Sequence, residues 1–90
     1  MKDGTYLMGK DGSLTPIEIS SGYWVAEEEI SLSDTQAGTI VGVWTDENGK
    51  VWTDKSYLVS DLDEALSLAD KWKQLAIWDN QKQKSVYLKK

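Results

Sequence analysis

The sequence contains no cysteine, no histidine and no arginine, and it has a single proline. Without cysteine the chain has neither disulfide bonds nor a thiolate that could attack a substrate or bind a metal ion. Without histidine it lacks the side chain that most often serves as a general base, a pH switch or a metal ligand. Without arginine it cannot bind a phosphate group through a bidentate guanidinium contact. Most of the common catalytic arrangements are therefore excluded.

Long apolar runs and phosphate-binding glycine motifs are also missing. No run approaches the roughly 20 apolar residues that a helix needs to cross a bilayer. The first ten residues, MKDGTYLMGK, contain no apolar segment of a signal peptide. The glycines match neither GxGxxG nor GxxxxGK, the two motifs that cradle phosphates. We therefore expect a cytoplasmic protein that does not enter a membrane.

Negative charge and indole rings are what the chain has in quantity. Its 90 residues include 15 acids, ten lysines, five tryptophans and four tyrosines, and the net charge is −5. The charge is uneven, since residues 1–70 carry −10 and residues 71–90 carry +5. Such asymmetry can mark a surface for a charged partner. A chain of this length buries enough surface for one modest core, so we expect a single domain over residues 1–90.

Residues 61–75 predict an amphipathic helix. Ser60 or Asp61 suits the N-cap, and acidic residues crowd the first turn, where the helix dipole favours them. Apolar residues then recur at spacings of three and four, which places them on one stripe. The stripe consists of Leu62, Ala65, Leu66, Ala69, Trp72 and Ala76.

A β-hairpin is predicted over residues 39–44 and 51–58, joined by the turn sequence DENGK. A two-residue Asn-Gly turn of type I′ would place Trp44 opposite Thr53. A type I turn followed by the glycine in the left-handed conformation would instead place Trp44 opposite Trp52. We favour the second register, because stacking two indoles across the strands adds about 0.5–1.5 kcal/mol beyond their burial.

Short apolar runs flanked by turn residues predict two further hairpins, one over residues 5–19 and one over residues 77–87. Pro16 places its strand at a sheet edge or at a bulge, because proline has no N–H to donate. Residues 23–26 predict another strand, which runs into three glutamates at 27–29. Side chains alternate between the two faces of a strand, so at least one face must meet water here.

The order of strands, then a helix, then strands predicts an α+β fold. We expect a small antiparallel β-sheet built from hairpins, with the one amphipathic helix packed on one face. The helix stripe and the apolar face of the 39–58 hairpin are expected to form most of the core. The first hairpin could pair beside the 39–58 hairpin or beside the last hairpin.

Acidic residues suggest metal binding at two places, and simpler roles explain both. Capping and the helix dipole account for Asp61, Asp63 and Glu64. The turn over residues 46–49 lacks the ligand spacing of a calcium loop. No spacing brings a serine, lysine or tyrosine together as nucleophile and base. We therefore expect a protein that is not an enzyme and that binds no metal ion or cofactor.

We interpret the chain as a protein–protein interaction module with an acidic binding surface. Its acids would suit a basic partner, for which electrostatic complementarity raises the association rate and the specificity. An aromatic side chain beside them would act as an anchor. The candidate site residues are Tyr23 or Trp24 as the anchor, if exposed, and Glu27, Glu28, Glu29 and Asp34 as the acids.

In size, acidity, lysine content and lack of any catalytic motif, the chain resembles the small accessory proteins of phages and mobile elements. That class includes anti-CRISPR proteins and toxin-neutralising immunity proteins. The resemblance implies an inhibitor of a nucleic-acid-handling host complex, and it implies no role for individual residues.

Two other functions compete with this interpretation. Tyr23, Trp24, Trp44 and Trp52 lie in predicted strands and could form a flat aromatic platform for a glycan or a nucleotide. Exposed edge strands of a small sheet could instead support a structural homo-oligomer such as a homodimer. Direct binding of nucleic acid is not expected, because the acidity of residues 1–70 repels phosphate.

Overall fold

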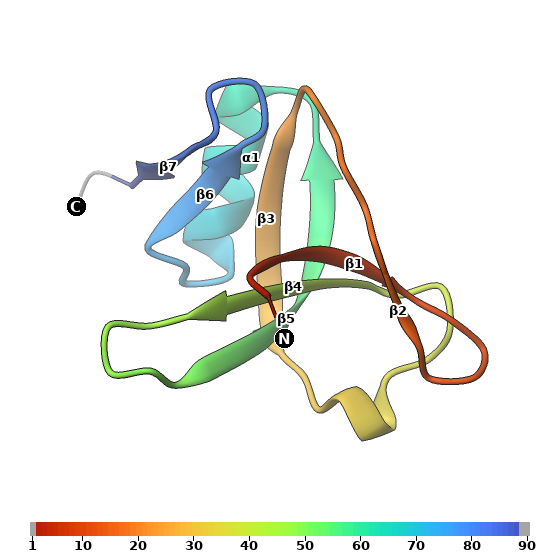
Figure 1. The fold of residues 1–90 in the computed structure, drawn as a ribbon. Coiled ribbons are helices and arrows are strands. Elements are labelled where there is room, and N and C mark those ends of the chain that lie inside the picture. The colour runs from red at the N-terminus through yellow and green to blue at the C-terminus, as the bar shows by residue number, and fades with distance from the viewer. Residues whose placement is uncertain (1, 89–90) are drawn as a thin grey trace. The chain divides into compact units, whose positions relative to one another are not determined.

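The computed structural model describes residues 2–88, which form an α+β fold (Figure 1). Within these residues seven strands make an antiparallel open sheet in the order β2-β1-β4-β5-β3-β6-β7, and there is one α-helix. The fold class predicted from the sequence is confirmed. The elements are β1 (Gly4–Met8), β2 (Leu14–Pro16), β3 (Tyr23–Glu29), the 3₁₀ helix η1 (Leu32–Asp34), β4 (Ile40–Thr45), β5 (Val51–Val59), α1 (Leu62–Lys71), β6 (Ala76–Asp79) and β7 (Lys84–Tyr87).

Contacts along the chain divide it into two compact units. The first unit comprises residues 1–18 and 28–56, and the second comprises residues 19–27 and 57–90. The two longest strands, β3 and β5, contribute residues to both units. Each unit has its own cluster of buried apolar side chains. The expectation of a single domain stays a prediction.

The core of the first unit consists of Tyr6, Val41 and Val43. β1 pairs antiparallel with β4, which sets Tyr6 opposite Val41 and resolves the strand order that the sequence left open. The sequence analysis was wrong to expect that the apolar face of the predicted 39–58 hairpin and the helix stripe form one core. Val41 and Val43 pack with Tyr6, because the pairing of β1 with β4 brings an aromatic ring from far along the chain.

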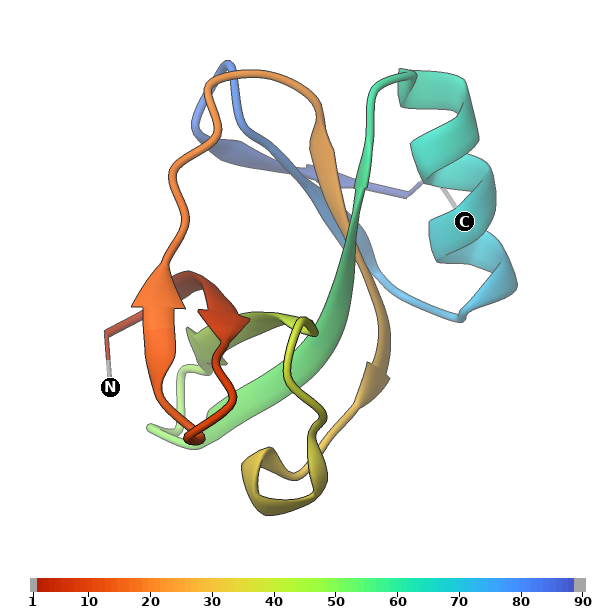
Figure 2. The ribbon, with the colours of Figure 1, turned by 90° about the vertical axis from the view of Figure 1, so that its right-hand side faces the viewer.

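The edge of the first unit carries the proline, as predicted. β2 stands at one end of the strand order and ends at Pro16, three residues before the predicted end of the strand. At that end β2 pairs with β1, and Figure 2 shows these two strands side by side. Proline lacks the N–H that a further strand would need, so its position at the edge leaves no hydrogen bond unmade.

The register of the β4–β5 hairpin is the one that the sequence analysis favoured. Trp44 lies opposite Trp52. The backbone N–H of Asp46 donates to the carbonyl of Lys50 at 2.9 Å, and Gly49 has a φ of 83°. Gly49 would have a positive φ in either turn, but a type I′ turn also needs a positive φ at Asn48, which is not among the described residues that have one, so the bulged turn is the one formed.

α1 begins where the capping pattern predicts it. The carboxylate of Asp61 accepts a hydrogen bond from the backbone N–H of Glu64 at 2.9 Å. The helix ends at Lys71, four residues before the predicted end. Lys73 takes a left-handed φ of 58°, and the N–H of Gln74 donates to the carbonyl of Ala69 at 2.8 Å. This reversal ends the helix, because the left-handed residue turns the chain away from the helix axis.

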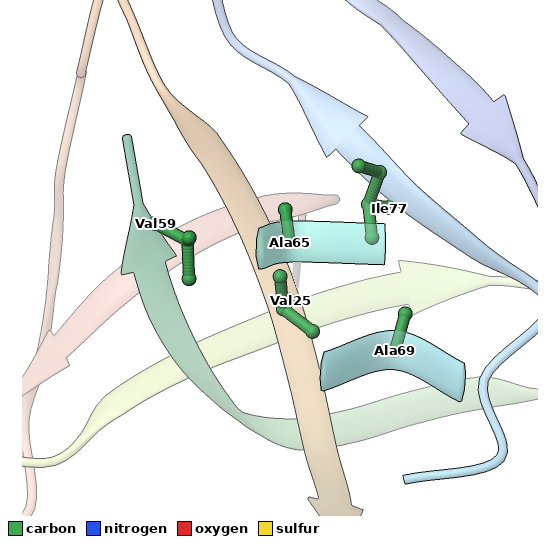
Figure 3. Packing of buried hydrophobic residues seen from close by; sticks show 5 residues of the cluster. All are labelled: Val25, Val59, Ala65, Ala69 and Ile77. Atoms are coloured by element: carbon green, nitrogen blue, oxygen red, sulfur yellow. The ribbon is translucent and has the colours of Figure 1, made fainter. Parts of the chain in front are cut away.

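The core of the second unit joins α1 to strands. It consists of Val25, Val59, Ala65, Ala69 and Ile77, and Figure 3 shows these side chains coming from β3, β5, α1 and β6. The helix contributes only alanines to the fully buried set, because small side chains let its backbone lie close to the strands. Larger residues at its flanks, Leu66, Leu68 and Trp72 among them, pack around this centre.

Candidate functional site

An open hollow of about 360 Å³ lies in the first unit, and we call it the acidic hollow. Three of the predicted site residues line it, namely Glu28, Glu29 and Asp34. The other lining residues are Ile30, Ser31, Thr35, Gln36, Thr39 and Lys55. Residues 28–36, which run from the end of β3 through η1, supply seven of the nine lining residues. Figure 2 shows the short η1 turn following β3. The structure thus brings three of the six predicted site residues together, and their role in binding stays a prediction.

Hydrogen bonds between neighbouring residues hold the η1 segment, and the carboxylate of Asp34 is exposed to water. The carbonyl of Ser31 accepts from the backbone N–H of Asp34 at 3.1 Å and from the hydroxyl of Thr35 at 2.7 Å. Ile30 and Leu32 pack against the core of the first unit and so anchor the segment. The segment contains one short 3₁₀ turn, Leu32–Asp34.

The pairing of β3 with β5 fixes the glutamates beside the hollow. The backbone N–H of Ile30 donates to the carbonyl of Thr53 at 2.9 Å, and the hydroxyl of Thr53 donates back to the carbonyl of Ile30 at 2.7 Å. Glu28 and Glu29 immediately precede Ile30, which makes these two hydrogen bonds, and both glutamates are exposed. Lys55 is the one cation among the nine described lining residues, so carboxylates outnumber ammonium groups three to one.

The remaining predicted site residues belong to the second unit and do not line the hollow. Trp24 is only 8% exposed, so it fails the condition set for an aromatic anchor. Tyr23 packs against the core of the second unit. Glu27 accepts a hydrogen bond from the hydroxyl of Tyr57 at 3.2 Å, and its backbone carbonyl accepts from the amide of Gln74 at 3.5 Å. These three residues therefore have local structural roles.

An exposed tryptophan lies elsewhere in the first unit, where the sequence analysis did not place an anchor. Trp44 is 47% exposed and stacks on Trp52, with ring centroids 5.7 Å apart and planes inclined by 14°. The indole N–H of Trp44 donates to Asp54 at 2.9 Å, and that of Trp52 donates to Asp46 at 3.0 Å. Both rings are thus held in fixed orientations. The favoured register and the alternation of side chains along a strand already place Asp54 on the same face as Trp52 and Trp44. This pattern is the sequence signal from which the Trp44–Asp54 contact could have been predicted.

Asp54 links the tryptophan pair to the acidic hollow. Burial raises the pKa of the Asp54 carboxyl, the hydrogen bond from Trp44 lowers it, and the negative charge of Glu29 raises it. Glu29 therefore acts in both places, since it also lines the hollow. Two carboxylates that repel each other beside an aromatic ring form an electrostatic environment that favours a cation.

The net negative charge of the chain resides in the first unit. That unit contains nine acids and four lysines, a net charge of −5, whereas the second unit contains six of each and is neutral. The acidic hollow and the tryptophan pair both lie in the charged unit. A basic partner would therefore be attracted to the unit that carries the hollow.

Two features that the described residues lack bear on the chemistry. Among residues 2–88, no three carboxylates come together as metal ligands. No helix in this part of the chain combines the length and the apolar character needed to cross a membrane. The arrangement can offer carboxylates, hydroxyls, amides and one exposed indole, which are groups that bind by charge, hydrogen bonding and stacking.

Fold and site together define a small α+β protein with an antiparallel sheet and an acidic, open polar site. No protein-family model, curated protein or solved structure matches the chain.

Proposed function

We propose that the protein is a non-enzymatic interaction module that binds a basic surface of a protein partner through the acidic hollow. The observation that carries this proposal is the meeting of Glu28, Glu29 and Asp34 at one hollow. These acids are exposed, so they are hydrated in the free protein and can contact a partner without a rearrangement of the fold. Charge complementarity of this kind acts mainly on the association rate and the specificity.

Hydrogen-bonding groups in the hollow support the binding of lysine or arginine side chains. Ser31, Thr35 and Gln36 place hydroxyl and amide oxygens among the carboxylates. A cationic head group in the hollow would satisfy its N–H donors on both kinds of oxygen, and charge-assisted hydrogen bonds are about twice as strong as neutral ones. The open shape suits side chains from a protein surface better than a small molecule that must be enclosed.

For the partner, we propose a nucleic-acid-handling complex in the cytoplasm of a bacterial host. Proteins of that class present basic surfaces to phosphate, and a row of carboxylates can occupy such a surface in place of nucleic acid. This role corresponds to an inhibitor carried by a phage or a mobile element, as the resemblance in size and acidity implies. The first unit, with its net charge of −5, is the part that would imitate phosphate.

Capture with charge-matched variants tests the proposal. The tagged chain is incubated with nuclease-treated bacterial lysate at low and at high salt, and captured proteins are identified by mass spectrometry. The site variant carries Glu28→Lys and Asp34→Lys. The control variant carries Glu18→Lys and Glu47→Lys, which change the charge of the same unit equally at exposed positions outside the hollow.

We expect a basic partner that is retained at low salt, is lost at high salt and is captured by the control variant at least tenfold better than by the site variant. Equal capture by the two variants would contradict the role of the hollow. A partner with an acidic surface, or one retained unchanged at high salt, would contradict the electrostatic mechanism.

The second candidate function is the binding of a small ligand, a glycan or a nucleotide, on the tryptophan pair. The exposure of Trp44 and its near-parallel stacking on Trp52 favour it, because a rigid indole face can stack on a ring. Quenching of tryptophan emission by a neutral sugar, with no dependence on salt, would support this function over the first.

A further inference from the structure

Two contacts hold the exposed Trp44 ring in one orientation. Stacking holds one face of the Trp44 ring, and the hydrogen bond to Asp54 holds its edge. The ring is nevertheless 47% exposed, so a large aromatic surface is fixed in position and open to solvent. Such a surface binds with little loss of conformational entropy, because its rotamer is already set.

The hairpin itself shows what its indoles attract. The Nζ atom of Lys50 lies 3.9 Å from the centroid of the Trp52 ring, in the position of a cation–π contact. Trp44 stacks on that same ring and extends the aromatic surface by one more indole. The tryptophan pair therefore already contains one ammonium–indole contact, at Trp52, and a guanidinium group can stack on an indole in the same way.

The carboxylates beside Trp44 favour a cation further. Asp54 is half-buried and accepts the Trp44 indole N–H, and the negative charge of Glu29 acts on it from β3. A cation placed against these groups would relieve the repulsion between the two carboxylates. A phosphate would add to it, and a neutral sugar would leave it unchanged.

We infer that Trp44, Asp54 and Glu29 form a subsite for an organic cation, the guanidinium or ammonium group of a side chain on the partner. The planar guanidinium of arginine can stack on an indole while its N–H groups donate to a carboxylate, so arginine fits best. This inference rests on the proposed function and names a second contact of the same binding surface. Glu29 joins the two contacts, since it also lines the acidic hollow.

An NMR titration of the full chain tests the subsite without a known partner. The probe is argininamide, and the signal is the indole N–H resonance of Trp44, assigned with the Trp44→Leu variant. Citrullinamide is the matched neutral probe, because it has nearly the shape of argininamide and no charge. Methyl glucoside tests for a sugar site.

We expect a saturable shift of the Trp44 resonance with argininamide, at least tenfold weaker binding of citrullinamide, and no shift with the sugar. Asp54→Asn and Glu29→Gln should each weaken argininamide binding at least threefold. Asp54→Asn keeps an oxygen that can accept the Trp44 N–H, so the ring stays in position. Glu47→Gln, which removes one charge from the same hairpin, should leave the affinity within twofold.

Equal binding of citrullinamide, a Trp44 shift with the sugar, or an unchanged affinity after Asp54→Asn would each overturn the subsite. Failure of the proposed function has a different signature. In that case Glu28→Lys with Asp34→Lys leaves capture intact, whereas argininamide still shifts Trp44 in the wild-type chain. If capture depends on the hollow and argininamide does not bind, the subsite alone is rejected.

Discussion

Two aspartates of one hairpin show how local contacts decide what a carboxylate does. Asp46 and Asp54 each accept an indole N–H, from Trp52 and Trp44 respectively. The hydrogen bond from Trp52, followed by the one from the Lys50 backbone, lowers the pKa of Asp46. Burial, with a smaller contribution from Glu29, raises the pKa of Asp54. Asp46 thus stabilises the turn in its ionised form, whereas ionised Asp54 costs stability.

Replacement of Asp54 by asparagine should stabilise the fold at neutral pH. A carboxyl whose pKa is raised on folding lowers stability as pH rises through that folded pKa, because the folded state binds its proton more tightly than the unfolded state. Asp54→Asn removes this cost while keeping an acceptor for Trp44. We expect a gain below about 1 kcal/mol at pH 7, since the group is half in water.

Urea unfolding of wild type and Asp54→Asn across pH 3 to 7 measures this gain. It should shrink as pH falls and Asp54 becomes protonated in the folded wild type. A constant difference at all pH values, or a loss of stability at pH 7, would contradict the account.

Asp46 should behave in the opposite way. Its ionised carboxylate accepts from the backbone N–H groups of Asn48 and Lys50 and from the Trp52 indole. A pKa lowered on folding contributes stability above the unfolded value, and this stability is lost as pH falls through the folded pKa. Asp46→Asn should therefore lower stability at pH 7 and flatten the decline below about pH 4. Thermal unfolding measured from pH 7 downward tests this. If stability falls with pH in Asp46→Asn as steeply as in the wild type, Asp46 does not have this role.

At the scale of elements, local signals were readable and distant pairings were not. The helix cap, which the sequence places at Ser60 or Asp61, and the favoured register of the β4–β5 hairpin both depend on neighbouring residues, and the structure confirms a cap at Asp61 and that register. The pairing of β1 with β4 brings Tyr6 to Val41 and Val43 and so forms a core for the first unit. No residue pattern within either strand predicts this pairing. Glu28 and Asp34 were identified as candidate site residues because charge is visible in a sequence. The link from Trp44 through Asp54 to Glu29 needed the pairing of β5 with β3.

The early end of α1 gives a test at the element scale. Lys73 holds a left-handed conformation that glycine adopts without strain. Lys73→Gly should therefore stabilise the protein by about 0.5–1 kcal/mol. Lys71→Gly, two residues earlier at the last helical position, should destabilise it by less than about 1 kcal/mol, the cost of glycine in a helix interior. Chemical denaturation of both variants distinguishes the signs, and destabilisation of similar size by both would show that the helix does not end here.

The tryptophan pair gives a second test at this scale. A double-mutant cycle with Trp44→Leu and Trp52→Leu isolates the contribution of their contact from that of their burial. With centroids 5.7 Å apart and near-parallel planes, we expect a coupling of about 0.5–1.5 kcal/mol. Thermal unfolding of the four proteins measures it. Effects that add within about 0.3 kcal/mol would mean that the rings only lie near each other.

At the scale of the whole molecule, charge separates the two units. The first unit carries the entire net charge of −5 together with the acidic hollow and the exposed indole, while the second unit is neutral and contains the helix. Net charge governs association and solubility more than fold. We therefore assign recognition to the first unit.

Hydrogen–deuterium exchange of the captured complex tests this assignment most directly. Compared with the free protein, the account predicts slower exchange at the backbone amides of residues 28–36, which include seven of the nine lining residues of the acidic hollow, and in the strand segments around Trp44 and Asp54. The amides of α1 should exchange as before. Slower exchange confined to α1, β6 and β7, with residues 28–36 unchanged, would place recognition on the neutral unit and contradict the account.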